Sequence, residues 1–252
     1  MGLRPWEADP VLEDRGPWTV VRDDLLPGGS KTRFLPFLLA GVEHAVFGGP
    51  FCGGAPWALA TVGKALGVKV TLFYAARAEV HPRQRAAFRL GAEIRVVRPG
   101  YMTVVQARAR EFCRRTGATF LPLGFDVPAA EDPFVAIMRG VRERFRDRRG
   151  ADPDQVWCAT GSGMLARCLA KAFPSSKVVG VRVGLSSRSS KQSFAPNVEL
   201  LDSGVPFERT HAGDVPFSSD RNYDAKAWSR ASREARGDRL LFWNVAGDAR
   251  SL

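Results

Sequence analysis

Lys31 lies in a turn where a lysine is hard to explain by packing or by solubility. Pro27, Gly28 and Gly29 form this turn after a short apolar run, and the apolar segment 34–39 predicts that a helix starts beside the lysine. A lysine at such a junction can be directed into a cleft, where desolvation lowers its pKa and makes the neutral amine available as a nucleophile or imine partner. A solvated lysine on a first helical turn is an equally good interpretation of the spacing.

A second motif, Thr160-Gly161-Ser162-Gly163-Met164, predicts an anion site. It connects an apolar strand to a helix, where glycines let backbone N–H groups converge and the helix N-terminus adds partial positive charge. Thr160 and Ser162 add hydroxyl donors. The dinucleotide fingerprint and the P-loop signature are both absent. A plain glycine connection between strand and helix is the alternative.

Together the two motifs resemble the fold type II pyridoxal-phosphate enzymes, above all the branch of D-cysteine desulfhydrase and aminocyclopropane-carboxylate (ACC) deaminase within the tryptophan synthase β-like superfamily. That family has a Gly-Gly-Asn-Lys-type turn early in the chain and a glycine-rich phosphate loop more than a hundred residues later. Here Ser30 stands in place of the asparagine, and Met164 stands where a threonine is common. The resemblance implies that Lys31 is covalently linked to pyridoxal 5'-phosphate (PLP) and that Thr160 to Met164 bind its phosphate.

A third segment, Gly48 to Trp57, resembles the family's loop for the substrate carboxylate. The resemblance implies that it faces the substrate through five residues: Phe51, Cys52, Gly53, Gly54 and Trp57. The polar side chains that usually bind the carboxylate are replaced by Cys, Gly, Ala, Pro and Trp. Either the site is degenerate, or a carboxylate with few hydrogen bonds is released there as carbon dioxide.

Two further residues are candidates through the same resemblance. Tyr223 precedes the last large helix and can act as an acid or base near the substrate; a half-buried aromatic at a helix start is the alternative. Asn244 follows the final strand and is the nearest candidate to contact the pyridine nitrogen. The three histidines and four cysteines show no metal-ligand spacing, so no metal site is predicted.

Alternating strands and helices must position these residues. The pattern predicts strands near 19–22, 45–48, 69–74, 94–97, 119–123, 156–159, 177–183 and 239–243, and helices near 34–41, 57–66, 81–90, 102–115, 132–149, 165–173 and 224–236. Such βαβ alternation favours a two-lobe α/β protein with mostly parallel sheets. Residues 1–44 and 131–252 are assigned to a larger, PLP-binding lobe, and residues 45–130 to a smaller one.

Charge is the unusual bulk property. The 252 residues contain 37 Lys and Arg against 26 Asp and Glu, a formal net charge of +11. A small-molecule enzyme does not need this excess, whereas a polyanionic partner such as DNA would be attracted by it. A basic surface without a partner is the alternative. Arginines that could form a patch are Arg139, Arg142, Arg144, Arg146, Arg148 and Arg149, extended by Arg83, Arg85, Arg89, Arg108, Arg110, Arg114 and Arg115.

These features favour a PLP-dependent lyase acting at the α-carbon of an amino acid. The weakened carboxylate loop and the charge, with a resemblance to bacteriophage enzymes of thymine hypermodification, predict decarboxylation of an amino-acyl thymine in DNA. A small-molecule desulfhydrase or deaminase and a non-catalytic DNA-binding relative are the alternatives. No apolar run reaches a membrane span and the N-terminus lacks a signal-peptide core, so a cytoplasmic protein without membrane contact is expected, in the host cytoplasm if it is phage-encoded. The family resemblance implies a homodimer.

Overall fold

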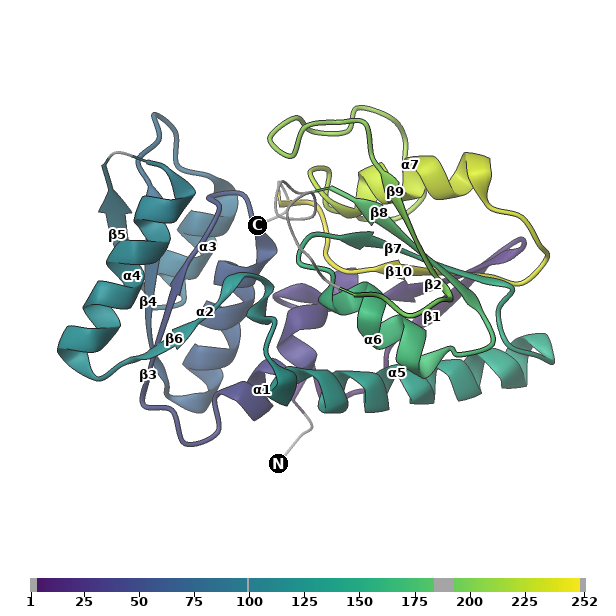
Figure 1. Ribbon diagram of the computed structural model, residues 1–252, viewed down its shortest axis with the longest axis horizontal. Coiled ribbons are helices and arrows are strands. Elements are labelled where there is room, and N and C mark those ends of the chain that lie inside the picture. Colours follow the sequence, from purple (N-terminus) through teal and green to yellow (C-terminus); the bar gives the residue numbers. More distant parts are fainter. Residues whose placement is uncertain (1–3, 99, 184–192, 250–252) are drawn as a thin grey trace. The chain divides into compact units, whose positions relative to one another are not determined.

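The computed structural model describes residues 4–98, 100–183 and 193–249 and divides into two units (Figure 1). Unit 1 comprises Met1–Leu26 and Glu131–Asp248, and unit 2 comprises Pro27–Ala130 and Ala249–Leu252. The division assigns residues 27–44 to unit 2, whereas the sequence analysis placed them in the larger lobe. The reason is that the turn and short helix after Gly28 pack on the helix Gly54–Leu66 of unit 2.

Unit 1 contains a six-stranded sheet in the order β1-β2-β10-β7-β8-β9. Its strands are β1 (Leu12–Arg15), β2 (Trp18–Arg22), β7 (Gln155–Thr160), β8 (Lys177–Arg182), β9 (Val198–Asp202) and β10 (Leu240–Asn244). Only the pair β1–β2 is antiparallel; every other neighbouring pair is parallel. Parallel pairing brings the carboxyl ends of β2, β10, β7 and β8 to one edge, which is where ligands bind in open α/β sheets.

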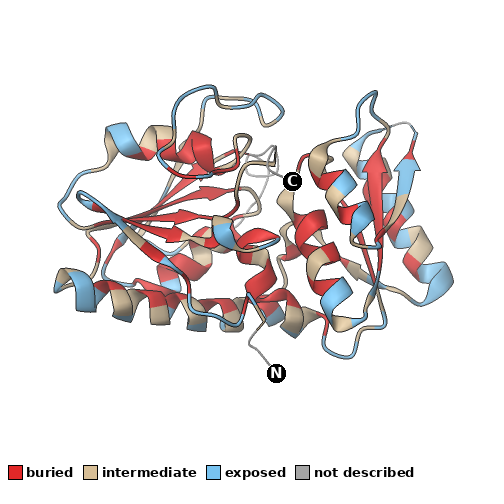
Figure 2. Cartoon of the chain, turned by 180° about the vertical axis from the view of Figure 1, so that it is seen from behind, coloured by how far each residue is buried: buried red, intermediate tan, exposed pale blue. Residues whose placement is uncertain are grey.

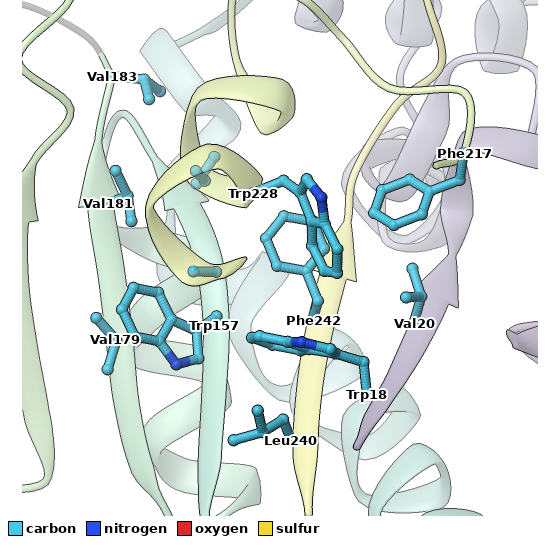
Figure 3. Packing of buried hydrophobic residues seen from close by; sticks show 13 residues of the cluster. Trp18, Val20, Trp157, Val179, Val181, Val183, Phe217, Trp228, Leu240 and Phe242 are labelled. Atoms are coloured by element: carbon cyan, nitrogen blue, oxygen red, sulfur yellow. The ribbon is translucent and has the colours of Figure 1, made fainter. Parts of the chain in front are cut away.

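Helices cover both faces of this sheet, as Figure 1 shows: α7 (Asp224–Glu234) lies on one face, and α5 (Pro128–Arg149) and α6 (Met164–Ala172) lie on the other. An aromatic cluster attaches α7 to the sheet (Figure 3). The ring of Trp228 lies 5.0 Å from that of Trp18, 5.1 Å from that of Phe242 and 4.9 Å from that of Phe217. Burial of such large rings fixes the start of α7, and with it Tyr223.

Unit 2 is a four-stranded parallel sheet in the order β5-β4-β3-β6. Its elements are η2 (Gly29–Arg33), α1 (Leu35–Leu38), β3 (His44–Gly48), α2 (Gly54–Leu66), β4 (Lys69–Ala75), α3 (Pro82–Arg89), β5 (Glu93–Val97), α4 (Met102–Thr116), β6 (Thr119–Leu121) and η3 (Leu123–Phe125). Helix α4 packs on one face through a core that includes Val46, Phe73, Val105 and Ala109. The inner strands β3 and β4 are buried, whereas the edge strand β5 is largely exposed (Figure 2).

The predicted fold class, α/β with mostly parallel sheets, is confirmed in both units. The sequence analysis missed β1 and β9, which are short outer strands whose pairing is not signalled by a local pattern. The helix predicted from Asp132 begins at Pro128 instead, so that Pro133 lies inside α5. Pro128 is well placed as the first residue of α5, because the N–H that proline lacks would have no helical partner in the first turn. Among the described residues, no helix combines the length and apolar character needed to cross a bilayer.

Candidate active site

Two glycines shape the lysine turn in unit 2. Gly28 has φ +97° and Gly29 has φ +72°, a left-handed backbone that side chains other than glycine rarely adopt. A β-carbon on Gly28 would lie 2.9 Å from Cα of Ala58, so the turn packs directly on the first half of α2. The hydroxyl of Thr32 donates to the Gly29 carbonyl at 2.7 Å. Lys31, half-buried, lies in a 3₁₀ turn directly before α1, whereas the helix predicted near 34–41 is shorter, at Leu35–Leu38.

The same helix carries the predicted carboxylate loop at its N-terminus. Gly53 caps α2 without any side-chain hydrogen bond, and Cys52 before it is buried. Phe51 is held between two neighbours, with the Arg77 guanidinium 5.0 Å above its ring and the His81 ring 5.9 Å away. Phe51 of the loop, together with residues at the start of α3 and just before it, lines an open cavity of about 480 Å³. Both segments are therefore positioned by α2 of unit 2: the lysine turn packs against this helix, and the loop at residues 51–57 leads into its N-terminus.

Arg83 is the residue of this loop region that the sequence analysis misplaced. It was assigned to a surface patch, but it is only 1% exposed. Its Nη1 donates to the Cys52 carbonyl at 2.9 Å and lies 3.9 Å from the position of a β-carbon on Gly54. The signal was present in the spacing, since Arg83 and the buried Ala87 are four residues apart and share one face of α3. A guanidinium beside a helix N-terminus is suited to a carboxylate.

In unit 1, the predicted phosphate turn connects β7 to α6. Gly163 caps the helix with φ +91°, and the backbone N–H of Met164 points to the hydroxyl of Ser162 at 3.5 Å. Thr160, the last residue of β7, is 2% exposed, and its Oγ1 has no hydrogen-bond partner among the described residues. A buried hydroxyl without a partner is costly. This hydroxyl is therefore a candidate donor to a ligand oxygen.

Tyr223 lies against the same turn. A β-carbon on Gly161 would be 3.3 Å from the Tyr223 hydroxyl, and the hydroxyl forms a hydrogen bond with the Gly161 backbone. Burial of the hydroxyl, followed by the nearby Asp224 carboxylate, raises the pKa of Tyr223 well above its ordinary value. The phenol consequently stays protonated near neutral pH, where it can donate a hydrogen bond or a proton but cannot serve as a base.

Asn244 ends β10, the strand next to β7, and is fully buried. Its Nδ2 donates to the Ser218 carbonyl and to Oδ1 of Asp24, both at 2.7 Å, and its Oδ1 accepts from the Ser219 hydroxyl at 3.0 Å. A pyridine nitrogen could accept a hydrogen bond from Asn244 only if one of these hydrogen bonds were broken. The arrangement instead makes Asn244 a support for Ser219, a buried hydroxyl that no local sequence pattern singled out.

The predicted site residues therefore fall into two groups. Unit 1 brings together the turn 160–164, Tyr223 and Asn244 at the carboxyl edge of its sheet. Unit 2 brings together Lys31 and the loop 51–57, with Arg83 as an additional member.

Comparison with known families gives a match over most of the chain. The model of the pyridoxal-phosphate dependent enzyme family matches residues 20–217, a range that includes the lysine turn, the loop and the phosphate turn. The chain belongs to this PLP-dependent enzyme family. No curated protein sequence matches it.

Solved structures of PLP enzymes share the fold. An ACC deaminase homologue aligns with a TM-score of 0.75 and 17% identity over 97% of this chain and 91% of its own. A threonine deaminase from T.th. aligns with a TM-score of 0.69 and 16% identity over 91% of this chain and 87% of its own. A hydrogen sulfide-producing enzyme from Fusobacterium nucleatum aligns with a TM-score of 0.68 and 14% identity over 98% of both chains. These matches establish the fold type II architecture.

The residues of the phosphate turn fit the cofactor of this family. PLP carries a phosphate dianion, and the turn offers it the Thr160 hydroxyl, a glycine backbone that no β-carbon obstructs, and the N-terminus of α6. Lys31 has the chemistry required to bind the cofactor aldehyde, and its turn lies on a rigid element.

Proposed function

We propose that this PLP enzyme catalyses an elimination or deamination at the α-carbon of an amino acid whose carboxylate is retained. The observation that carries the proposal is the buried Arg83 guanidinium beside the N-terminus of α2, in the same unit as Lys31. Ion pairing stabilises a carboxylate in its charged form and so opposes its departure as carbon dioxide. The sequence analysis favoured decarboxylation because the side chains of the loop lack hydrogen-bond donors and the chain is strongly basic, and neither observation took a buried guanidinium into account.

Each residue has a stated task in this proposal. When bound, the cofactor supplies the electron sink that stabilises negative charge at the substrate α-carbon. Arg83 and the backbone N–H groups at the start of α2 orient the substrate through its carboxylate. The Nζ amine of Lys31 accepts the α-proton, while Tyr223, which stays protonated, donates a hydrogen bond at the phosphate turn.

Decarboxylation is the second candidate, and one observation favours it. The loop side chains Phe51, Cys52 and Trp57 are apolar, and α2 has no side-chain cap. The substrate could be a free amino acid or, as the sequence analysis predicts, an amino-acyl thymine in DNA. Neither of the deaminases that share the fold is described as a decarboxylase.

The experiment measures ammonia, sulfide and carbon dioxide from free amino acids, with D-cysteine included, and from DNA carrying an amino-acyl thymine. Borohydride reduction followed by peptide mapping should place the pyridoxyl group on Lys31. The Arg83→Gln variant should raise KM about 10- to 150-fold, the loss expected from one charge-assisted pair of about 1.5–3 kcal/mol. Arg83→Lys should recover part of it, and Arg89→Gln, an exposed arginine at the end of α3 that does not line the cavity, should change nothing.

The two candidates give opposite results in the Arg83 variant. Removal of the guanidinium should slow elimination, but it should speed the release of carbon dioxide if the enzyme is a decarboxylase. Carbon dioxide without ammonia or sulfide from the wild-type protein would refute the proposal. Attachment of the pyridoxyl group to another lysine would refute the assignment of Lys31.

A further inference from the structure

The positive charge of this chain is concentrated in unit 2. Residues 27–130 contain 14 Lys and Arg against 5 Asp and Glu, a formal +9 of the chain's +11. A charge so unevenly distributed creates a local field that attracts polyanions. Only arginines that are exposed and not already engaged within the protein can bind such a partner.

Four of the six arginines at the end of α5, first considered as a phosphate-tracking row, are engaged inside unit 1. Arg149 donates to the Trp18 carbonyl at 2.9 Å, Arg144 to the Pro10 carbonyl at 2.6 Å and Arg148 to the Leu12 carbonyl at 3.2 Å. Arg142 forms an ion pair with Asp152 at 2.5 Å. These side chains hold the N-terminal hairpin and the turn before β7, so they are poor candidates for an external partner.

Unit 2 presents a different group of arginines, on its edge strand β5, just after it and on helix α4. We define the β5–α4 surface as the exposed residues Arg95, Arg98, Tyr101, Arg108, Arg114 and Arg115. Strand and helix are joined by Arg95, whose guanidinium lies 4.4 Å above the ring of Phe112. Arg95 pairs with Glu93 and Arg108 with Glu111. Within the described ranges, Arg98, Arg114 and Arg115 make no ion pair.

An exposed aromatic ring, that of Tyr101, follows Arg98 by three residues. Tyr101, at the N-cap of α4, is 71% exposed, which is more than any other large hydrophobic side chain in the described part of the chain. A single exposed ring is ordinary on a protein surface. Tyr101 is informative because it follows the arginines at β5 and precedes those of α4 in a unit of strong positive charge. Arginines beside an exposed aromatic form the combination that binds single-stranded nucleic acid, with phosphates on the guanidinium groups and a base on the ring.

We propose that the β5–α4 surface binds the phosphate backbone of nucleic acid, with Tyr101 stacking on an unpaired base. Charge complementarity selects this partner, because phosphodiesters supply many negative charges and unit 2 carries a formal +9 between residues 27 and 130. The proposal is independent of the reaction that the enzyme catalyses. Arginine on an exposed edge strand also prevents pairing with a second copy of the sheet, but that role requires Arg95 alone and none of the arginines on α4.

The test measures the fluorescence anisotropy of labelled single-stranded DNA of about 25 nucleotides and of labelled duplex DNA of about 25 base pairs, at salt concentrations from about 50 to 200 mM. One variant carries Arg98→Gln, Arg114→Gln and Arg115→Gln. The matched control carries Arg139→Gln, Arg209→Gln and Arg233→Gln, three exposed arginines of unit 1, and loses the same charge. The first variant should bind more weakly and lower the slope of log K against log salt by about 2–3, whereas the control should stay close to wild type.

Tyr101→Ala separates the two probes. It should weaken single-stranded binding about tenfold and leave duplex binding nearly unchanged. The proposal is overturned if wild type binds neither probe, if both triple variants lose affinity equally, or if the β5–α4 variant changes the oligomeric state but not DNA binding. Because all of these measurements are made without substrate, a failed activity assay does not affect them.

Discussion

Thr160→Val is the substitution whose effects on folding and on cofactor binding should have opposite signs. The Thr160 hydroxyl is buried without a hydrogen-bond partner among the described residues, at the end of β7. Valine has nearly the same shape and replaces the hydroxyl with a methyl group. The apoprotein therefore loses a polar group that was removed from water without compensation, while the holoenzyme loses a donor to the cofactor phosphate.

The magnitudes follow from these two environments. Burying a hydroxyl without a partner costs about 1–3 kcal/mol, so the free energy of unfolding of the apoprotein should rise by about 1 kcal/mol. A hydrogen bond to a charged phosphate contributes about 1.5–3 kcal/mol, so affinity for PLP should fall about 10- to 150-fold.

Urea unfolding of the apoprotein measures the first effect, and titration with PLP, followed by cofactor absorbance, measures the second. Thr19→Val is the matched control in unit 1. The hydroxyl of Thr19 donates to Asp14 at 2.6 Å and accepts from Arg149 at 3.2 Å, so its loss should destabilise the apoprotein by about 1–3 kcal/mol and leave PLP affinity unchanged.

Two results would refute the reasoning. Destabilisation of the Thr160→Val apoprotein by more than about 1 kcal/mol would mean that the hydroxyl has an internal partner after all. Unchanged PLP affinity would mean that Thr160 does not contact the phosphate and that the turn has another function.

Three further predictions concern the lysine turn, the tyrosine and an ion pair. Gly28→Ala should lower the free energy of unfolding by about 3 kcal/mol in urea titrations, because the left-handed φ and the contact with the Ala58 backbone both oppose a β-carbon. Gly16 is the control: its φ is also positive, at +58°, but the space around it is open, so Gly16→Ala should lower the free energy of unfolding by only about 1–2 kcal/mol. Tyr223→Phe should reduce kcat/KM about tenfold and leave the shape of the plot of kcat/KM against pH unchanged, because the raised pKa keeps the phenol of Tyr223 protonated. If the wild-type plot falls at alkaline pH and the variant's does not, the phenol titrates in that range and the prediction is wrong. The hydrogen bond from Arg142 lowers the pKa of Asp152, so the contribution of this pair to stability is complete above about pH 4 and is lost as the pH falls further. Asp152→Asn should therefore flatten the loss of unfolding free energy below about pH 4, and an unchanged slope there would exclude this pair as a cause.

Local sequence determined the frame of the protein and named the candidate residues for binding its cofactor. Alternating strands and helices predicted a parallel α/β fold, because side-chain periodicity is a property of each segment alone. The turns at Gly28 and Gly163 were predictable for the same reason, since glycine is the residue that tolerates positive φ. Lys31 and Thr160 could be named as candidates from their positions next to these turns.

Tertiary structure alone decided which polar groups meet. Arg83 and Arg149 are both arginines of basic helices, yet one is buried behind the Cys52 carbonyl and the other holds the strand at Trp18. Asn244 is engaged with Ser218 and Ser219, which lie more than twenty residues away along the chain. Residue type sets what a side chain can donate or accept, but its partner is set by long-range packing that no local pattern encodes.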